Sequence, residues 1–146
     1  MSDFREVTTS FWASPQITVA DVAEASALGF ALILNNRPEG ETDDQTSGAV
    51  IREAAQAAGM DYRAIPVTPG GFTHEQVSAM AETLDQAQGP VLAYCRSGTR
   101  STLLWSLAQA FRGRDPDAIA AEAAGAGYDV GPIMPALADL AGRARD

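Results

Sequence analysis

The sequence predicts an α/β fold, in which a central, mainly parallel sheet of about four strands is flanked by helices. Up to about residue 112, short apolar runs of β-type residues alternate with alanine-rich stretches whose apolar residues recur at helical spacing. The run FALIL at 30–34 is apolar throughout, which is typical of a strand buried on both faces. The length of 146 residues fits one compact domain spanning 1–146, with extra helices at its C-terminal end.

Capping and breaking residues set the bounds of the predicted elements. Thr18 and Asp21 form a capping box at the start of the first helix. Pro66 removes one donor from a strand, which predicts an edge position or a strand end there. Asp115 and Pro116 cap and begin the first of the C-terminal helices. The predicted strands are 10–13, 30–34, 62–67 and 91–94, and the predicted helices are 18–28, 47–58, 73–87, 102–111, one from 116 and one over 132–141.

Composition and charge exclude several classes of protein. Nineteen acidic and ten basic residues give a formal charge of −9, so no overall positive field attracts nucleic acid or anionic lipid. One cysteine forms no internal disulfide, and no apolar run is long enough for a signal peptide or a membrane span. One histidine and one cysteine do not make a zinc cluster. We therefore expect a cytoplasmic protein with no metal, no cofactor, and no nucleic-acid or membrane partner; the pattern does not predict its oligomeric state.

The segment VLAYCRSGTRS at 91–101 carries the main functional signal. It places Cys95 at the end of a strand and Arg100 at the start of a helix, so the chain between them must curl tightly. In such a curl the backbone N–H groups point inward, and the helix N-terminus adds about half a positive charge. Gly98 permits the positive φ that the curl requires, and the guanidinium of Arg100 can hold two oxygens of an anion. The predicted anion-binding residues of this loop are Arg96, Ser97, Gly98 and Thr99.

The same loop predicts a reactive sulfur at Cys95. A helix N-terminus and a nearby cation favour the thiolate, which is the nucleophilic form of cysteine. Ser101 is placed to donate a hydrogen bond to this thiolate and to help it leave from a covalent intermediate. Taken without its loop, a lone cysteine after an apolar strand is more often a buried small hydrophobe.

The C-R-x-G-x-R-S pattern resembles the active-site loop of cysteine-dependent phosphatases and of rhodanese-type sulfurtransferases. The wider chain, with SPQIT, NNRPEGE, AAGMDYRAIPV and PVLAYCRSGTRSTLLWSLA, is similar over most of 10–112 to the bacterial beta-lactamase hydrolase-like protein, phosphatase-like domain family. The resemblance implies a tyrosine or dual-specificity phosphatase-like fold. It also implies that Cys95 is the nucleophile, the 96–100 backbone the phosphate cradle, Arg100 the oxyanion clamp and Ser101 the partner of the thiolate.

Two features depart from the pattern of tyrosine phosphatases. Cys95 and Arg100 enclose four residues, as in rhodaneses, whereas those phosphatases have five. The loop TPGGFTHEQ lacks the aspartate that serves them as general acid. Loops after parallel strands meet at one rim, so Arg37 is expected there as a second charge for the anion. The acids expected at the same rim, none of them singled out by the sequence, are Glu39, Glu41, Asp43, Asp44, His74 and Glu75.

Three functions follow from these observations. The first is hydrolysis of a phosphorylated substrate through a cysteinyl-phosphate, and the second is sulfur transfer through a Cys95 persulfide. The third is binding of a phosphorylated partner or a small anion without turnover, which the missing aspartate favours. Structural alternatives also exist: Arg100 could pair with carboxylates, His74 is expected to be exposed, and Trp105 is expected in the core.

Overall fold

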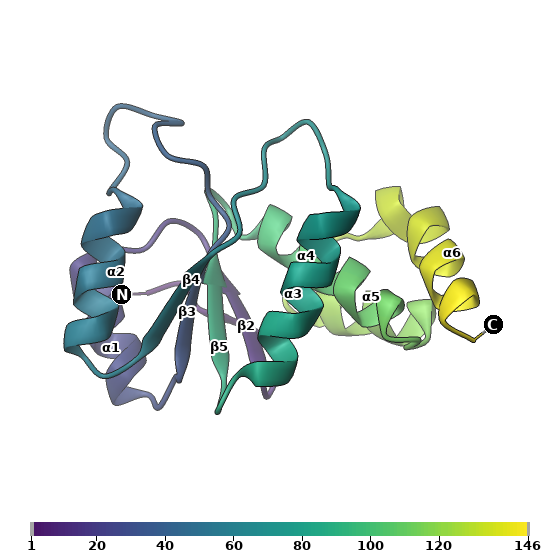
Figure 1. The fold of residues 1–146 in the computed structure, drawn as a ribbon, viewed down its shortest axis with the longest axis horizontal. Coiled ribbons are helices and arrows are strands. Elements are labelled where there is room, and N and C mark those ends of the chain that lie inside the picture. Colours follow the sequence, from purple (N-terminus) through teal and green to yellow (C-terminus); the bar gives the residue numbers. More distant parts are fainter. Residues whose placement is uncertain (1, 146) are drawn as a thin grey trace.

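The computed structural model describes residues 2–145 and has at its centre a five-stranded sheet with the order β1-β2-β5-β3-β4 (Figure 1). Strand β1 pairs with β2 in the antiparallel sense, and all the other pairs are parallel. The α/β class and the mainly parallel sheet are thus confirmed. The strands are β1 Arg5–Thr8, β2 Phe11–Ser14, β3 Leu32–Asn35, β4 Asp61–Ala64 and β5 Val91–Tyr94.

The prediction of about four strands misses β1, the antiparallel strand at one edge of the sheet. Its sequence, REVT, carries two charges, and only Val7 is buried. Charged side chains are common on edge strands, where they discourage pairing with other chains, and they hide the strand from a search for apolar runs. At the opposite edge, β4 ends before Pro66, as the missing donor of that proline predicts.

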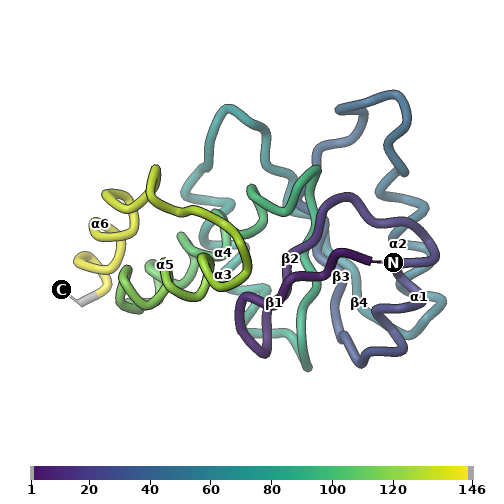
Figure 2. The backbone as a smooth tube through the Cα atoms, turned by 180° about the vertical axis from the view of Figure 1, so that it is seen from behind, coloured from purple at the N-terminus to yellow at the C-terminus, as the bar shows by residue number. Residues whose placement is uncertain are grey.

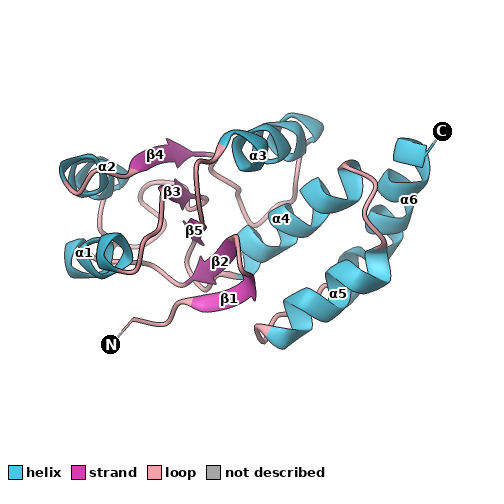
Figure 3. Cartoon of the chain, turned by 90° about the horizontal axis from the view of Figure 1, so that it is seen from below, coloured by secondary structure: helices cyan, strands magenta, loops and turns pink. Residues whose placement is uncertain are grey.

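Helices cover both faces of the sheet (Figure 3). Two of them, α1 and α2, lie against one face, and α3 and α4 lie against the other. The C-terminal helices pack beyond α4, at the opposite end of the molecule from α1 and α2 (Figure 2). The helices are α1 Val19–Ala27, α2 Gly48–Ala57, α3 His74–Gln86, α4 Thr99–Phe111, α5 Pro116–Gly125, the short 3₁₀ turn η1 Gly131–Ile133 and α6 Met134–Arg145.

Each face of the sheet has its own hydrophobic core. Side chains alternate along β5, so that Ala93 joins the core under α3 and α4 while Leu92 joins the core under α1 and α2. Trp105 of α4 is buried and stacks on Phe11, with ring centroids 5.4 Å apart, which confirms its expected place in the core. Leu137 of α6 is fully buried in the same core, so the C-terminal helices complete it.

The loops that follow β3, β4 and β5 meet at one edge of the sheet, at the top of Figure 1. Arg100, which follows β5, contacts Glu41 from the loop after β3 and the carbonyl of Val67 from the loop after β4. This meeting follows from the parallel strand directions and agrees with the predicted rim.

Candidate functional site

Cys95 follows directly on β5 and lies at the bottom of the curled loop. Its side chain is buried and is not in a disulfide. The backbone N–H of Gly98 donates a hydrogen bond to its Sγ, with a nitrogen–sulfur distance of 3.1 Å. The Cys95 N–H donates in turn to the carbonyl oxygen of Ser14 on β2, at 3.3 Å. The loop therefore turns at least one backbone dipole toward the sulfur, and that dipole stabilises negative charge there.

Gly98 is the residue that permits the curl. Its φ is +94°, in the left-handed region, and it caps α4 without a side-chain hydrogen bond. A Cβ at this position would lie 2.1 Å from the hydroxyl oxygen of Tyr128 and 3.3 Å from the carbonyl oxygen of Ser14. No larger residue fits here. The N–H of Thr99, the first of α4, donates to the hydroxyl of Ser97 at 3.4 Å, and no carboxylate binds this helix terminus in place of an anion. Helix α4 accordingly begins at Thr99, three residues before the predicted start.

Arg100 forms a two-pronged ion pair with Glu41. Its Nη1 and Nη2 donate to the two carboxylate oxygens at 2.7 and 2.8 Å, and Nη1 also donates to the carbonyl oxygen of Val67 at 2.6 Å. The side chain of Arg100 is only 14% exposed. The guanidinium thus binds two oxygens at once, as expected from its shape, but both belong to the carboxylate of Glu41.

Arg37 lies on the other side of the same carboxylate and is almost completely buried. Its Nε donates to Glu41 at 2.9 Å, and its Nη1 donates to Oε1 of Gln16 at 3.0 Å. Arg100, followed by Arg37, lowers the pKa of Glu41 to about 2, although burial opposes the shift. Glu41 is therefore ionised at neutral pH and has no proton to donate.

The remaining predicted loop residues differ in exposure. Arg96, Ser97 and Thr99 are exposed, and the hydroxyls of Ser97 and Thr99 are 3.1 Å apart. Ser101 is fully buried, and its Oγ has no hydrogen-bond partner within the described part of the chain. The predicted hydrogen bond from Ser101 to the sulfur is therefore not formed in this structure.

The other acids expected at the rim are engaged elsewhere or are free in solvent. Glu39 accepts from the backbone N–H of Gly48 at the start of α2. Asp44 accepts from the hydroxyl of Thr42, which lowers the pKa of this carboxyl. His74 is exposed, as expected, and its ring lies edge-on to Phe111, 5.8 Å between centroids. Asp43 and Glu75 are also exposed.

Tyr128, which follows α5, is part of the site although nothing in the sequence marked it. Its buried hydroxyl lies behind Gly98 and donates to the carbonyl oxygen of Ser97 at 3.4 Å. Burial raises the pKa of Tyr128, so the hydroxyl stays protonated at neutral pH. Tyr128 thereby supports the loop at Ser97 and Gly98, and no motif connects it to Cys95 in the sequence.

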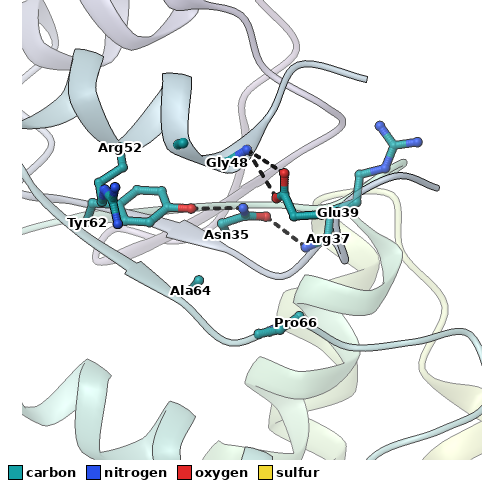
Figure 4. Close-up of a pocket in the computed structure, with 9 residues that line it drawn as sticks. Asn35, Arg37, Glu39, Gly48, Arg52, Tyr62, Ala64 and Pro66 are labelled. Carbon is teal, nitrogen blue, oxygen red and sulfur yellow. Dashed lines mark hydrogen bonds between the residues drawn. The ribbon is translucent and has the colours of Figure 1, made fainter. Parts of the chain in front are cut away.

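A pocket of about 300 Å³ opens at the same rim between α2 and β4 (Figure 4). Tyr62 and Arg52 lie together at one end, and the hydroxyl of Tyr62 accepts from the side-chain amide of Asn35 at 2.9 Å. Figure 4 shows the guanidinium of Arg37 pointing away from this pocket. The pocket is lined by Asn35, Arg37, Glu39, Gly48, Ala49, Arg52, Tyr62, Ala64 and Pro66, and does not include Cys95 or Arg100.

Within residues 2–145, no group of three or more histidine, cysteine, aspartate or glutamate side chains is placed to hold a metal ion. None of the helices in this range combines the length and the apolar character that crossing a membrane requires.

Comparison with known proteins agrees with the geometry of the loop. Residues 3–112, which include every strand and the Cys95 loop, match the family described as beta-lactamase hydrolase-like protein, phosphatase-like domain. The chain belongs to this family. Its C-terminal helices α5 and α6 lie beyond the matched residues.

Two curated relatives of the family are beta-lactamase hydrolase-like proteins. The one from Agrobacterium fabrum is 41% identical over 99 residues, which are 68% of this chain and 23% of the relative. The one from Xylella fastidiosa strain Temecula1 is 33% identical over 104 residues, 70% of this chain and 24% of the relative. The chain thus spans about a quarter of the length of these relatives.

Solved structures resemble the whole chain, C-terminal helices included. A candidate phosphatase from Neisseria meningitidis is 32% identical, with a TM-score of 0.84 over 96% of this chain and 99% of its own. The kinase associated phosphatase is 14% identical, with a TM-score of 0.71 over 99% of this chain and 96% of its own. The fold is therefore that of tyrosine and dual-specificity phosphatases, and the chain is phosphatase-like.

Proposed function

We propose that this protein hydrolyses phosphate monoesters through a covalent cysteinyl-phosphate at Cys95. The observation that carries the proposal is the hydrogen bond from the Gly98 N–H to Sγ, in a loop that joins a buried strand to a helix whose N-cap residue is glycine. This arrangement stabilises a thiolate beneath a site for a tetrahedral oxyanion. It is supported by the family of the chain and by its phosphatase-like structural neighbours.

The reaction has two steps. In the first, the sulfur attacks phosphorus, an S–P bond forms, and the P–O bond to the leaving group breaks with its electron pair on oxygen. In the second, water attacks phosphorus, the S–P bond breaks, and inorganic phosphate leaves with the thiolate restored. In both, Arg100 and the loop amides stabilise the charge on the oxygens that do not react. Arg96, Ser97, Gly98 and Thr99 supply the cradle in this proposal, and Ser101 lies next to it as the partner of the departing thiolate.

Aryl phosphates are the substrate class that fits these residues. Glu41 is ionised and no aspartate lies in the loop after β4, so the leaving oxygen depends on its own acidity. Phenolates leave more readily than alkoxides for this reason. A solved complex of Pseudomonas aeruginosa TpbA with phosphotyrosine, 15% identical with a TM-score of 0.63, agrees with an aryl phosphate such as phosphotyrosine as substrate. A free-thiol nucleophile also suits the reducing conditions of the cytoplasm.

Hydrolysis of p-nitrophenyl phosphate tests the proposal. We expect turnover by the wild-type protein, none by Cys95→Ser, and a rate that falls steeply as the leaving group becomes less acidic. Retention of the activity by Cys95→Ser contradicts the mechanism.

Sulfur transfer is a second candidate function, favoured by two observations. The loop between Cys95 and Arg100 has four residues, and the sulfur is fully buried, so a small electrophile reaches it more easily than a large one. The thiolate would attack the outer sulfur of thiosulfate and release sulfite, and cyanide would then remove the sulfane sulfur as thiocyanate. Thiocyanate formation without phosphatase activity selects this function. Neither activity, with phosphate binding retained, selects a non-catalytic anion-binding role.

A further inference from the structure

We propose that Glu41 is a positioning residue, whose carboxylate holds the Nη1–Nη2 edge of the Arg100 guanidinium so that the adjacent Nε–Nη2 edge faces an anion in the Cys95 loop. The inference rests on the proposed function only in requiring that the loop bind an oxyanion. It applies equally to a phosphoryl substrate and to thiosulfate.

The first argument is a count of the donors of Arg100. A guanidinium has five N–H groups in one plane. The two on Nη1 are used by Glu41 and by the carbonyl of Val67, and one on Nη2 is used by Glu41. The Nε–H and the second N–H of Nη2 remain. No oxygen among residues 2–145 accepts from either, and the acceptor nearby is the Cys95 sulfur. These two N–H groups lie side by side on one edge, with the spacing that two oxygens of a tetrahedral anion need.

The second argument is that Arg100 follows closely on the residue that binds the sulfur: the N–H of Gly98, two positions before Arg100, donates to Sγ of Cys95 at 3.1 Å. The pKa of Arg100 is raised, mainly by its hydrogen bond to Glu41 and further by the nearby Cys95 sulfur. An anion seated above Sγ is therefore close to the unused Nε–Nη2 edge of Arg100, while Glu41 occupies the adjacent Nη1–Nη2 edge.

The third argument is that Glu41 is itself held in place. Arg37 donates to its carboxylate at 2.9 Å and is only 4% exposed. The backbone N–H of Glu41 donates to the side-chain oxygen of Gln45 at 2.9 Å, and the amide of Gln45 donates back to the carbonyl of Pro38. A carboxylate fixed from both its side chain and its backbone can orient Arg100 before the ligand arrives. In this arrangement Arg37 acts through Glu41, and does not contact the anion itself.

The alternative role is that of a competing carboxylate, which occupies Arg100 and so weakens anion binding. The two roles predict changes of opposite sign when the charge of Glu41 is removed. Glu41→Gln leaves two guanidinium groups without their shared carboxylate, which by charge alone increases the attraction for an anion. If Glu41 competes with the anion, Glu41→Gln binds anions more strongly. If Glu41 positions Arg100, Glu41→Gln binds anions more weakly despite the added positive charge.

The test is the ratio of the alkylation rates of Cys95 by iodoacetate and by iodoacetamide. Cys95 is the only cysteine, so all alkylation of thiol reports this site. Iodoacetate carries a carboxylate that Arg100 can bind and iodoacetamide does not, so the ratio measures anion recognition without any turnover. Asp43→Asn is the matched control, because it removes the same charge from an exposed position in the same loop.

We expect Glu41→Gln to lower the ratio about tenfold, because an anion misaligned at the loop loses paired hydrogen bonds. We expect Asp43→Asn to stay within about twofold of the wild type. Glu41→Asp keeps the charge but shortens the side chain, and we expect about a threefold fall. A ratio that is unchanged or higher in Glu41→Gln overturns the inference. If Glu41→Gln does not fold, the same result in Glu41→Asp overturns it.

The same experiment separates this inference from the proposed function. A ratio that falls in Glu41→Gln supports the positioning role even if the wild-type protein hydrolyses no phosphate ester. A wild-type protein that hydrolyses p-nitrophenyl phosphate while its ratio does not respond to Glu41→Gln keeps its proposed function and loses the positioning role. No preference for iodoacetate in the wild type overturns the inference at its first step.

Discussion

Helices α2 and α4 both begin at the edge of the sheet where the parallel strands end, but their N-termini have different hydrogen-bond partners. At α2, Ser47 Oγ accepts from the Val50 N–H at 3.3 Å, and both carboxylate oxygens of Glu39 accept from the Gly48 N–H. At α4, the cap is Gly98, which has no side chain to offer, and its own N–H points to a sulfur. The chain therefore neutralises one helix terminus with its own carboxylate, whereas the other, beside Cys95, has only the Ser97 hydroxyl, which accepts from the Thr99 N–H at 3.4 Å.

The loop after β3 supplies one carboxylate to each of these two helices. Glu39 stabilises the N-terminus of α2, whereas Glu41, two residues later, pairs with Arg100 on α4. A carboxylate that accepts from the first amides of a helix stabilises that helix. A carboxylate that binds the arginine beside a helix N-terminus instead orients this arginine toward an anion. The predictions below test whether the two termini really differ in this way.

The largest effect is expected from Gly98→Ala, at the N-terminus of α4. The new methyl group would overlap the Tyr128 hydroxyl, and the φ of +94° is unfavourable for alanine. We expect at least about a hundredfold loss of Cys95 alkylation by iodoacetate, because the loop must shift by an ångström or more. The control is Gly59→Ala, which has a similar φ of +84° but no atom within 4 Å, and which should alkylate at the wild-type rate. Equal rates in the two variants would contradict the account of the loop.

The next largest effect is expected from Arg100→Lys. Lysine keeps the charge but lacks the planar group that binds two oxygens, so we expect phosphate affinity to fall about tenfold. Isothermal titration with inorganic phosphate measures the change. Arg112→Lys is the control, since Arg112 is about half exposed and pairs with Asp85 away from the loop. An Arg100→Lys protein that binds phosphate as the wild type does would show that charge alone suffices.

A pH-dependent effect is expected from Glu41. The pKa of this carboxyl falls from 4.5 to about 2 on folding, because Arg100 and then Arg37 stabilise its charge. A lowered pKa means that the ion pair stabilises the folded state above the unfolded pKa and is lost as the pH falls from 4.5 toward 2. Urea unfolding at a series of pH values should therefore show wild type and Glu41→Gln converging in stability over this interval. A difference that stays constant down to the acid limit would mean that the pair contributes nothing.

The smallest effect is expected at the capped terminus. Glu39→Gln keeps an acceptor for the Gly48 N–H but removes the charge, so we expect a loss of about 0.5–1 kcal/mol in the free energy of unfolding. Cys95 alkylation should not change, since Glu39 does not contact the loop. Slower alkylation in Glu39→Gln would show that the two termini are coupled after all.

Local patterns in the sequence were enough to predict most of the fold and the centre of the site. The capping box at Thr18 and Asp21 forms as predicted, and the apolar run FALIL supplies most of the interior strand β3. Cys95, Gly98 and Arg100 could be singled out because they belong to one short loop, whose geometry depends on neighbouring residues.

Features that depend on distant residues were out of reach. Glu41 and Arg100 are 59 positions apart, and only the folded sheet brings them within 2.7 Å. The charge of Arg37 suggested a second contact for the anion, but the structure directs it to Glu41 and Gln16. Tyr128 follows α5 and belongs to no motif, and its position behind Gly98 depends on how α5 packs on α4 and β1.

The most direct test of the account is a crystal structure of the protein grown with inorganic phosphate. We expect phosphate above Sγ of Cys95, with its oxygens bound by the loop amides and by Nε and Nη2 of Arg100, and with Glu41 still bound to Nη1 and Nη2 of that guanidinium. An empty loop at saturating phosphate, or phosphate bound elsewhere with Arg100 unchanged, would contradict the claim that this loop is the catalytic anion site.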